Sequence, residues 1–169
     1  MTTTKDSGLI KAILACDEEG GIAKEGTLPW PKNTKDLQWF KENTKGHVVV
    51  MGSATWEDEH MPSPMPLRTN VLITSRPDEY PGADDYISGD IGHIVCLVAD
   101  KYAGLITWVV GGANVIEQTL DSIEEFYISR IPGKHNCDTF LPLDAIEERF
   151  ELAHVTAHPE VVFEIWKRK

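Results

Sequence analysis

The acidic residue Asp36 lies in a segment whose other residues could make its carboxylate a ligand-binding group. The sequence Leu-Pro-Trp at residues 28–30 ends six positions before it, and the surrounding pattern predicts a helix over residues 34–44. Leu37 and Phe40 place an apolar wall beside Asp36, so its side chain could face a cleft. A carboxylate in an apolar cleft suits a cationic or hydrogen-bond-donating heterocycle. The plain alternative is an acid that only complements the helix dipole.

Two glycine-containing segments come directly after apolar runs and before helical patterns. They are MGSATW at residues 51–56 and VVGGAN at residues 109–114. Glycine at such a turn lets a ligand approach the backbone, and the free N–H groups at the start of the next helix can bind phosphate. Neither segment is GxGxxG, so the standard Rossmann fingerprint is absent. Each segment taken alone could equally be an ordinary turn between a strand and a helix.

Two arginines flank the apolar run NVLIT at residues 70–74. After this run, Thr74, Ser75 and Arg76 offer two hydroxyl groups and a guanidinium, which suit a phosphate monoester. Arg68, before the run, could bind a carboxylate through two parallel hydrogen bonds. The alternative is that both arginines are solvated surface residues.

Strands that alternate with helices must position these residues. We expect strands over residues 10–16, 47–51, 70–74, 84–88, 106–110 and 124–131, and a C-terminal hairpin over residues 150–157 and 161–166. We expect a loop over residues 17–27 and helices over residues 34–44 (with Thr34 as the N-cap), 53–60, 92–101 and 113–120. This order predicts an α/β fold: a central, mainly parallel twisted sheet with an antiparallel C-terminal edge and helices on both faces. Ligands of such sheets bind at the carboxyl ends of the strands.

The composition predicts one domain over residues 1–169, in which residues 1–7 are a flexible extension. The net charge of −11 argues against nucleic acid and membrane partners. Three cysteines without CxxC spacing argue against a disulfide framework or a zinc site and favour a reducing cytosol. The six histidines show no metal-binding spacing and no GxSxG motif is present, so we expect neither a metal site nor a serine nucleophile.

Taken in order and spacing, the segments resemble the dihydrofolate reductase family along nearly the whole chain. The resemblance rests on GGIAKEGTLPW, DLQWFK, VVVMGSATWE, NVLITSRP, VVGGANVIEQ and CDTFLP. It implies the dihydrofolate reductase-like fold and a cytoplasmic, monomeric enzyme whose cofactor is NADPH and whose substrate is dihydrofolate. Such an enzyme reduces 7,8-dihydrofolate to 5,6,7,8-tetrahydrofolate by hydride transfer and supplies one-carbon carriers for thymidylate and purine synthesis.

The resemblance also implies a role for each matching residue at the substrate. Asp36 would bind N3 and the 2-amino group of the pterin, while Trp30 would hold an ordered water and Leu28 would belong to a mobile loop that closes over the nicotinamide. Arg68 would bind the α-carboxylate of the glutamate tail, and Ser129 would support Asp36 by hydrogen bonding. The pterin and nicotinamide pocket would be lined by Ile13, Ala15, Leu37 and Phe40.

For the cofactor, the resemblance implies a cis peptide between Gly111 and Gly112 at the pyrophosphate. Residues 74–76 would hold the adenosine and its 2′-phosphate, which favours NADPH over NADH. The residues expected to contact the cofactor are Ala15, Ile22, Gly52, Ser53, Ala54, Thr55, Thr74, Ser75, Arg76, Val110, Gly111, Gly112, Ala113, Asn114 and Val115.

Two alternatives stay open at the level of the sequence. One is a relative on the same fold that reduces another heterocycle; Asp36 and Arg68 argue against it, because a glutamate-tailed pterin needs both. The other is a non-catalytic module that binds NADPH or folate. Ile116 and Ala54 favour this second alternative, because the family often carries a tyrosine and a basic residue at these positions.

Overall fold

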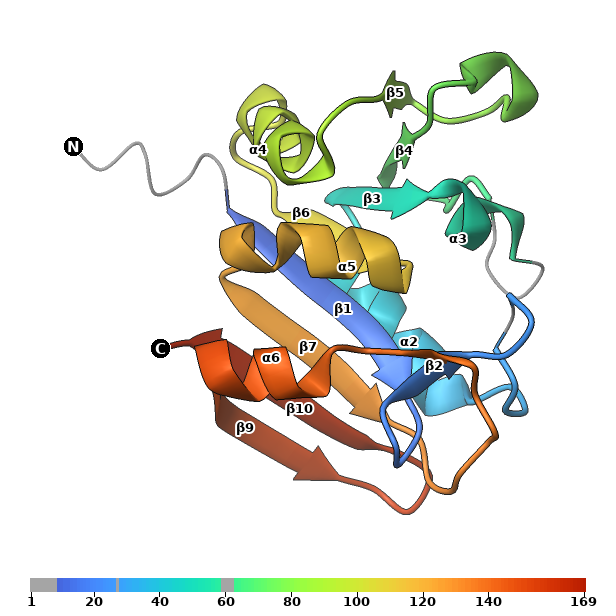
Figure 1. Ribbon diagram of the computed structural model, residues 1–169, viewed down its shortest axis with the longest axis vertical. Coiled ribbons are helices and arrows are strands. Elements are labelled where there is room, and N and C mark those ends of the chain that lie inside the picture. Colours follow the sequence, from blue (N-terminus) through green and yellow to red (C-terminus); the bar gives the residue numbers. More distant parts are fainter. Residues whose placement is uncertain (1–8, 27, 59–62) are drawn as a thin grey trace.

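The computed structural model describes residues 9–26, 28–58 and 63–169, and these residues build an eight-stranded sheet (Figure 1). Its strands lie in the spatial order β5-β4-β3-β6-β1-β7-β10-β9. Neighbouring strands from β5 to β7 run parallel, whereas β10 is antiparallel to both β7 and β9. The strands are β1 (Ile10–Cys16), β3 (Val48–Gly52), β4 (Thr69–Ile73), β5 (Asp85–Ile87), β6 (Thr107–Gly111), β7 (Glu125–Arg130), β9 (Phe150–Ala157) and β10 (Val162–Arg168).

Helices cover both faces of this sheet because its central strands carry apolar side chains on both faces. In β1, for example, Ala12 belongs to the core beneath α5 and α6, whereas Ile13 belongs to the core beneath α2. Figure 1 shows α5 and α6 in front of the sheet and α2 behind it. The helices are α2 (Thr34–Thr44), α3 (Ser53–Glu57), α4 (Ile91–Lys101), α5 (Ala113–Thr119) and α6 (Leu143–Arg149), with 3₁₀ turns η1 (Pro77–Glu79) and η2 (Leu120–Ser122). The predicted fold class is therefore confirmed.

Four helix boundaries differ from the sequence-based expectation. Two differ by one residue: α4 begins at Ile91 and not at Gly92, and α5 ends at Thr119 and not at Leu120. Asn33, and not Thr34, is the N-cap of α2, because the Asn33 Oδ1 accepts a hydrogen bond from the Asp36 N–H at 3.0 Å. The helix expected over residues 53–60 ends at Glu57, because Asp58 already has extended backbone angles. Residues 59 and 60 of that expectation, and the flexible extension expected over residues 1–7, lie outside the described residues.

Three short elements were not expected from the sequence. They are helix α6 and the strands β2 (Gly21–Ala23) and β8 (Thr139–Phe140), which pair as a separate two-stranded sheet. The strand β2 lies inside the segment expected to be a loop. The two strands are too short to show a clear hydrophobic period, and their pairing joins residues more than a hundred positions apart.

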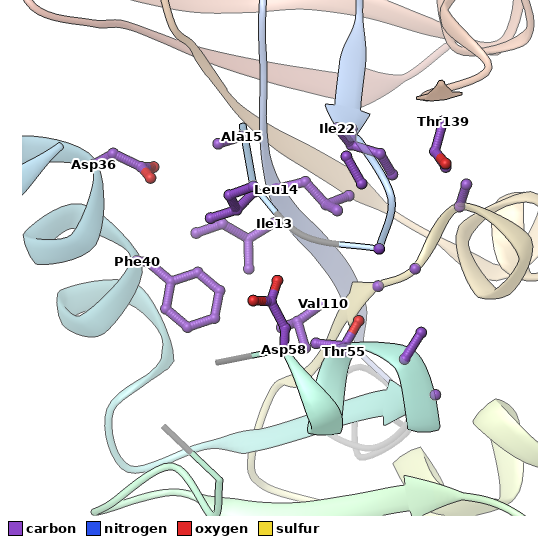
Figure 2. Close-up of a pocket in the computed structure, with 18 of the residues that line it drawn as sticks. Ile13, Leu14, Ala15, Ile22, Asp36, Phe40, Thr55, Asp58, Val110 and Thr139 are labelled. Atoms are coloured by element: carbon purple, nitrogen blue, oxygen red, sulfur yellow. The ribbon is translucent and has the colours of Figure 1, made fainter. Parts of the chain in front are cut away.

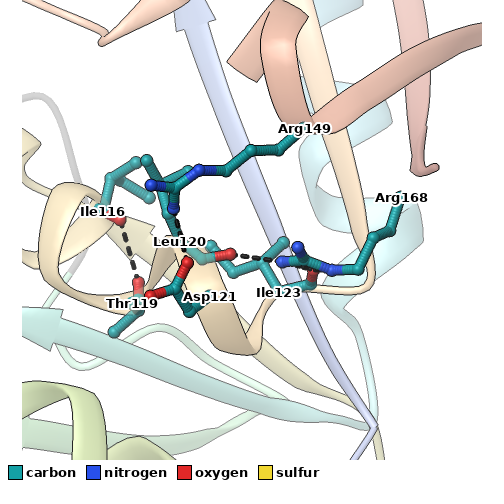
Figure 3. Close-up of polar contacts among 7 residues, drawn as sticks. All are labelled: Ile116, Thr119, Leu120, Asp121, Ile123, Arg149 and Arg168. Atoms are coloured by element: carbon teal, nitrogen blue, oxygen red, sulfur yellow. Dashed lines mark hydrogen bonds and ion pairs between the residues drawn. The ribbon is translucent and has the colours of Figure 1, made fainter. Parts of the chain in front are cut away.

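The guanidinium of Arg168 joins the last strand, β10, to the segment between α5 and β7 (Figure 3). Its Nε and Nη2 atoms donate hydrogen bonds to the Ile123 carbonyl at 2.9 and 2.6 Å, and Nη2 also donates to the Leu120 carbonyl. The same guanidinium lies over the Phe150 ring, 4.7 Å from its centroid. Arg168 therefore joins the end of β10 to the turn that precedes β7 and to the start of β9.

No described helix combines the length and the apolar character that crossing a membrane would require.

Candidate active site

A cavity of about 840 Å³ opens at the carboxyl ends of β1, β3 and β6. This is the edge at which a parallel sheet binds ligands. Most of the residues expected at the site from the sequence line it: Ile13, Ala15, Ile22, Leu28, Trp30, Asp36, Leu37, Phe40, Gly52, Ser53, Ala54, Thr55, Arg68, Val110, Gly111, Gly112, Ala113, Asn114 and Val115. Four expected residues are not among its lining: Ser129, Thr74, Ser75 and Arg76.

Asp36 brings a nearly buried carboxylate to one end of the cavity. Its side chain is only 8% exposed, and Figure 2 shows the carboxylate directed from α2 toward Ala15 on β1. Burial raises the pKa of Asp36 above its ordinary value, and the nearby Ser129 hydroxyl opposes that rise. The Ser129 Oγ is itself buried and makes no hydrogen bond of normal geometry within the described chain. A ligand with N–H donors would offset the burial of this acid.

Apolar side chains surround the carboxylate. Phe40 lies one helical turn after Asp36, and Ile13 of β1 points into the same space from the sheet (Figure 2). Trp30, 5% exposed, also lines the cavity, and its ring centroid lies 5.6 Å from that of His135 in an edge-on arrangement. A flat heterocycle could therefore lie between apolar walls with its polar edge against Asp36.

The Gly111–Gly112 pair forms the turn from β6 into α5, and its peptide bond is cis, as expected. Gly111 has a φ of 137°, which side-chain-bearing residues seldom adopt, and a Cβ there would lie 2.9 Å from the Thr55 Oγ1. A Cβ on Gly112 would instead project into open space. At this turn, Gly112 therefore leaves the backbone open toward the cavity, and Gly111 packs tightly against α3.

Arg68 brings a positive charge to the cavity beside the far end of α2. Its Nε donates to the Pro66 carbonyl at 2.9 Å and its Nη1 to the Thr44 Oγ1 at 3.2 Å. These two bonds fix the guanidinium and leave other N–H groups for a ligand. Burial lowers the pKa of Arg68 below its ordinary value, so an incoming carboxylate would compensate a partly desolvated cation.

The residues expected at the 2′-phosphate lie one strand away from the cavity. Ile73, the last residue of β4, is paired with Gly52, which begins the turn into α3. Residues 74–76 follow at the same edge of the sheet, where Ser75 and Arg76 are exposed. The Arg76 Nη1 lies 3.4 Å from a Glu79 carboxylate oxygen, and the Thr74 Oγ1 accepts from the Arg76 N–H at 3.0 Å.

Two carboxylates hold the segment that carries Ile22 beside the cavity. The buried Asp17 accepts backbone hydrogen bonds from Glu19, Gly21 and His135, each at 2.9 Å. Burial acts to raise the pKa of Asp17, but these bonds outweigh it and hold the pKa below its ordinary value.

Asp138 fastens the outer part of the same segment. Its Oδ2 accepts from the Glu25 N–H at 2.9 Å, and its own N–H donates to the Ala23 carbonyl at 3.0 Å. The segment therefore has a buried anchor at one end and an exposed anchor at the other.

The comparison with protein families decides what kind of site this is. Residues 9–164 match the family model described as "Dihydrofolate reductase". The chain belongs to the dihydrofolate reductase family. Similar members include dihydrofolate reductase type 8 from Escherichia coli, 26% identical over 164 residues (95% of this chain and 96% of the relative), and dihydrofolate reductase from Staphylococcus aureus, 30% identical over 141 residues (82% and 81%).

A solved dihydrofolate reductase shares the architecture. The structure of dihydrofolate reductase from Enterococcus faecalis complexed with NADP(H) and RAB-propyl superposes with a TM-score of 0.83 at 29% identity, covering 96% of this chain and 98% of that one.

Sequence reasoning missed several lining residues of this family member: Leu14, Ala23, Gly26, Pro31, Lys32, Asn33, Lys41, Asp58, Met65 and Thr139. Lys41 could have been found, because it lies one helical turn after Leu37. Asp58 and Thr139 gave no such signal. Asp58 lies at the cavity because α3 ends early, and Thr139 lies there because β8 pairs with β2, which is distant in the chain. Of the two residues that favoured a non-catalytic module, Ile116 is fully buried in the core, whereas Ala54 lines the cavity.

Proposed function

We propose that the protein binds 7,8-dihydrofolate in this cavity and reduces it to 5,6,7,8-tetrahydrofolate, with NADPH as the hydride donor. The observation that carries the proposal is the nearly buried carboxylate of Asp36, which faces an apolar cavity that also receives the guanidinium of Arg68. A pterin with a glutamate tail has the matching groups, because its ring offers N–H donors and its tail offers a carboxylate. Membership of the dihydrofolate reductase family supports the same reaction.

Asp36 acts on the pterin in two ways. Its carboxylate accepts hydrogen bonds from N3–H and the 2-amino group, which fixes the orientation of the ring. It also stabilises the positive charge that the ring gains when N5 takes a proton, and this effect is strengthened by the apolar side chains of Ile13 and Phe40, which line the same space.

The chain also fits a dinucleotide cofactor. The bare backbone at Gly112, where a Cβ would project into open space, leaves room for a pyrophosphate. Thr55 and Ile22 line the cavity and would contact the nicotinamide. Arg76, exposed after β4, would contact the 2′-phosphate. When bound, NADPH supplies the hydride. The Enterococcus faecalis relative, solved with NADP(H), supports this cofactor.

The test is a spectrophotometric assay with NADPH and dihydrofolate, following the loss of the near-ultraviolet absorbance of NADPH. We expect turnover from the native chain and severe loss in Asp36→Asn. Binding of both compounds without turnover would favour a non-catalytic module. Turnover with another reduced heterocycle, but not with dihydrofolate, would favour a relative of different specificity.

The 2′-phosphate site has its own test. Arg76→Ala should raise the KM for NADPH by about tenfold, because one charge-assisted hydrogen bond to a phosphate is lost, and should leave the KM for NADH nearly unchanged. An equal effect on both cofactors would remove Arg76 from the phosphate. We also propose that the chain works in the cytoplasm as a monomer; its three free cysteines support a reducing compartment.

A further inference from the structure

Asn33 lines the cavity at the start of α2 and uses both ends of its side-chain amide. Its Oδ1 accepts the hydrogen bond from the Asp36 N–H at 3.0 Å, and its Nδ2 donates to the Glu160 carbonyl, also at 3.0 Å. These partners fix the orientation of the amide, because a flipped side chain would set its NH₂ group against an N–H and its oxygen against a carbonyl. Asn33 therefore joins the helix that carries Asp36 to a segment 127 residues further along the chain.

That segment is the turn between β9 and β10, and two features hold it in place. The His158 N–H donates to the Val161 carbonyl at 3.0 Å and closes the turn. The Val161 side chain is fully buried in one apolar cluster with Trp30 and Ile131. After the turn, β10 pairs with β7, which in turn pairs with β1. The bond from Asn33 thus connects the first turn of α2 to the central sheet.

A second contact between α2 and the C-terminal hairpin lies further along the helix. The Trp39 ring stacks on the Phe163 ring of β10, with the centroids 4.3 Å apart. Trp39 comes about one turn after Asp36, so this contact by itself leaves the first turn of the helix unattached. With Asn33 before the acid and Trp39 after it, α2 is joined to the hairpin on both sides of Asp36.

We propose that Asn33 is a positioning residue of the active site, because it joins the start of α2 to the β9–β10 turn and so fixes the Asp36 carboxylate where it meets the heterocycle. The proposal rests on the proposed function, since it takes Asp36 as the acid that binds the pterin. Two parallel hydrogen bonds from a flat ring need both carboxylate oxygens near the plane of the ring, so a small shift of the first helical turn weakens them.

The substitution Asn33→Ser separates the two bonds of this side chain. Serine is a good N-cap acceptor, but its side chain ends one bond earlier than that of asparagine, so the hydrogen bond to the Glu160 carbonyl is lost. The probe is a competitive inhibitor with a 2,4-diaminopyrimidine head, which pairs with a carboxylate through two parallel hydrogen bonds. We expect the Kd of the probe to rise about tenfold and kcat/KM for dihydrofolate to fall by a similar factor, while the Kd for NADPH changes by less than about twofold.

A double-mutant cycle shows whether Asn33 acts through Asp36. In an Asp36→Asn background the probe has no carboxylate to pair with, so adding Asn33→Ser should change its Kd by less than about twofold. An equal loss in both backgrounds would overturn the proposal, because Asn33 would then support the cavity as a whole. Native probe binding and native turnover in Asn33→Ser would overturn it too.

Two matched controls keep stability apart from positioning. Asn43 lies in the last turn of the same helix, where its Nδ2 donates to the Trp39 carbonyl at 2.8 Å, so Asn43→Ala weakens α2 away from Asp36. Glu160→Ala removes an exposed side chain and leaves the carbonyl that Asn33 uses. Both variants should bind the probe as the native chain does. Thermal unfolding of each variant checks folding, and Asn33→Thr is the second variant if Asn33→Ser does not fold.

The outcomes also separate this proposal from the proposed function. If Asp36→Asn weakens the probe and removes turnover while the Asn33 variants behave as the native chain does, the positioning role is wrong and the proposed function stands. If Asp36→Asn leaves both probe binding and turnover unchanged, the proposed function itself is wrong.

Discussion

At the scale of single residues, we expect Asp36 to serve the reaction at a cost in stability. Its pKa is raised by burial, so between the ordinary pKa of an aspartate and this raised value the folded state binds more protons than the unfolded chain. The free energy of unfolding of the ligand-free protein must therefore fall as the pH rises through that window. We expect Asp36→Asn to remove this part of the pH dependence and to be more stable than the native chain at neutral pH, as measured by denaturant titration.

The same substitution should lower kcat at neutral pH by about a hundredfold or more, because a neutral amide cannot stabilise the protonated pterin. Stopped-flow or steady-state kinetics measure this. A variant that is both more stable and nearly inactive would establish that Asp36 lowers stability and is needed for turnover. Near-native turnover would contradict the role of Asp36.

Arg68 should act on binding rather than on the chemical step. Arg68→Ala removes a charge-assisted contact to the substrate carboxylate, and we expect the KM for dihydrofolate to rise about 10- to 100-fold with little change in kcat. Arg68→Lys should recover only part of the loss, because an ammonium cannot make two parallel bonds to a carboxylate. A pterin without the glutamate tail is the control, since its KM should not respond to either variant.

The sequence predicted individual residues well where spacing within one element sufficed. Leu37 and Phe40 were found from helical spacing around Asp36. Asp58 was not, because its position depends on where α3 stops, and the five-residue helix has no sequence signal strong enough to fix its end. Thr139 reaches the cavity only through contacts that are distant in the chain.

At the scale of elements, the contribution of Asp17 to holding the segment that contains β2 can be tested. Asp17→Ala leaves three backbone N–H donors without their carboxylate, and we expect the free energy of unfolding to fall by about 3 kcal/mol or more. Amide hydrogen exchange should quicken at Glu19, Gly21 and His135. Since the pKa of Asp17 is lowered in the folded chain, its contribution is present above the ordinary aspartate pKa and lost as the pH falls below it.

Asp138→Ala is the matched comparison, because Asp138 is exposed and its carboxylate accepts the Glu25 N–H. We expect a loss of about 1 kcal/mol or less there. Equal losses in the two variants would mean that burial adds nothing to the Asp17 anchor.

Long elements were easier to predict than short ones. The parallel strands β1, β3, β4 and β6 are recognised as apolar runs because both of their faces are buried, and the C-terminal hairpin is recognised from alternation. The strands β2 and β8 span only three and two residues, which is too little sequence for a period to appear.

At the scale of the whole molecule, the Arg168 contacts should decide how firmly the C-terminal hairpin is held. Arg168→Met removes the donors to Leu120 and Ile123 and leaves two carbonyl groups without them, so we expect a loss of roughly 2 kcal/mol or more. Lys167→Met, in the same strand but half exposed, should change stability by less than about 0.5 kcal/mol. Chemical denaturation of the two variants measures the difference, and similar midpoints would contradict this role.

The helix α2 carries Asp36 at its start and holds Arg68 through Thr44 at its end, so one rigid helix sets the spacing between the two groups that we propose recognise the ligand. We therefore expect the enzyme to select substrates by the distance between their heterocycle and their acid group. Compounds with the right head and the right acid, but with one methylene too many or too few between them, should engage only one end at a time.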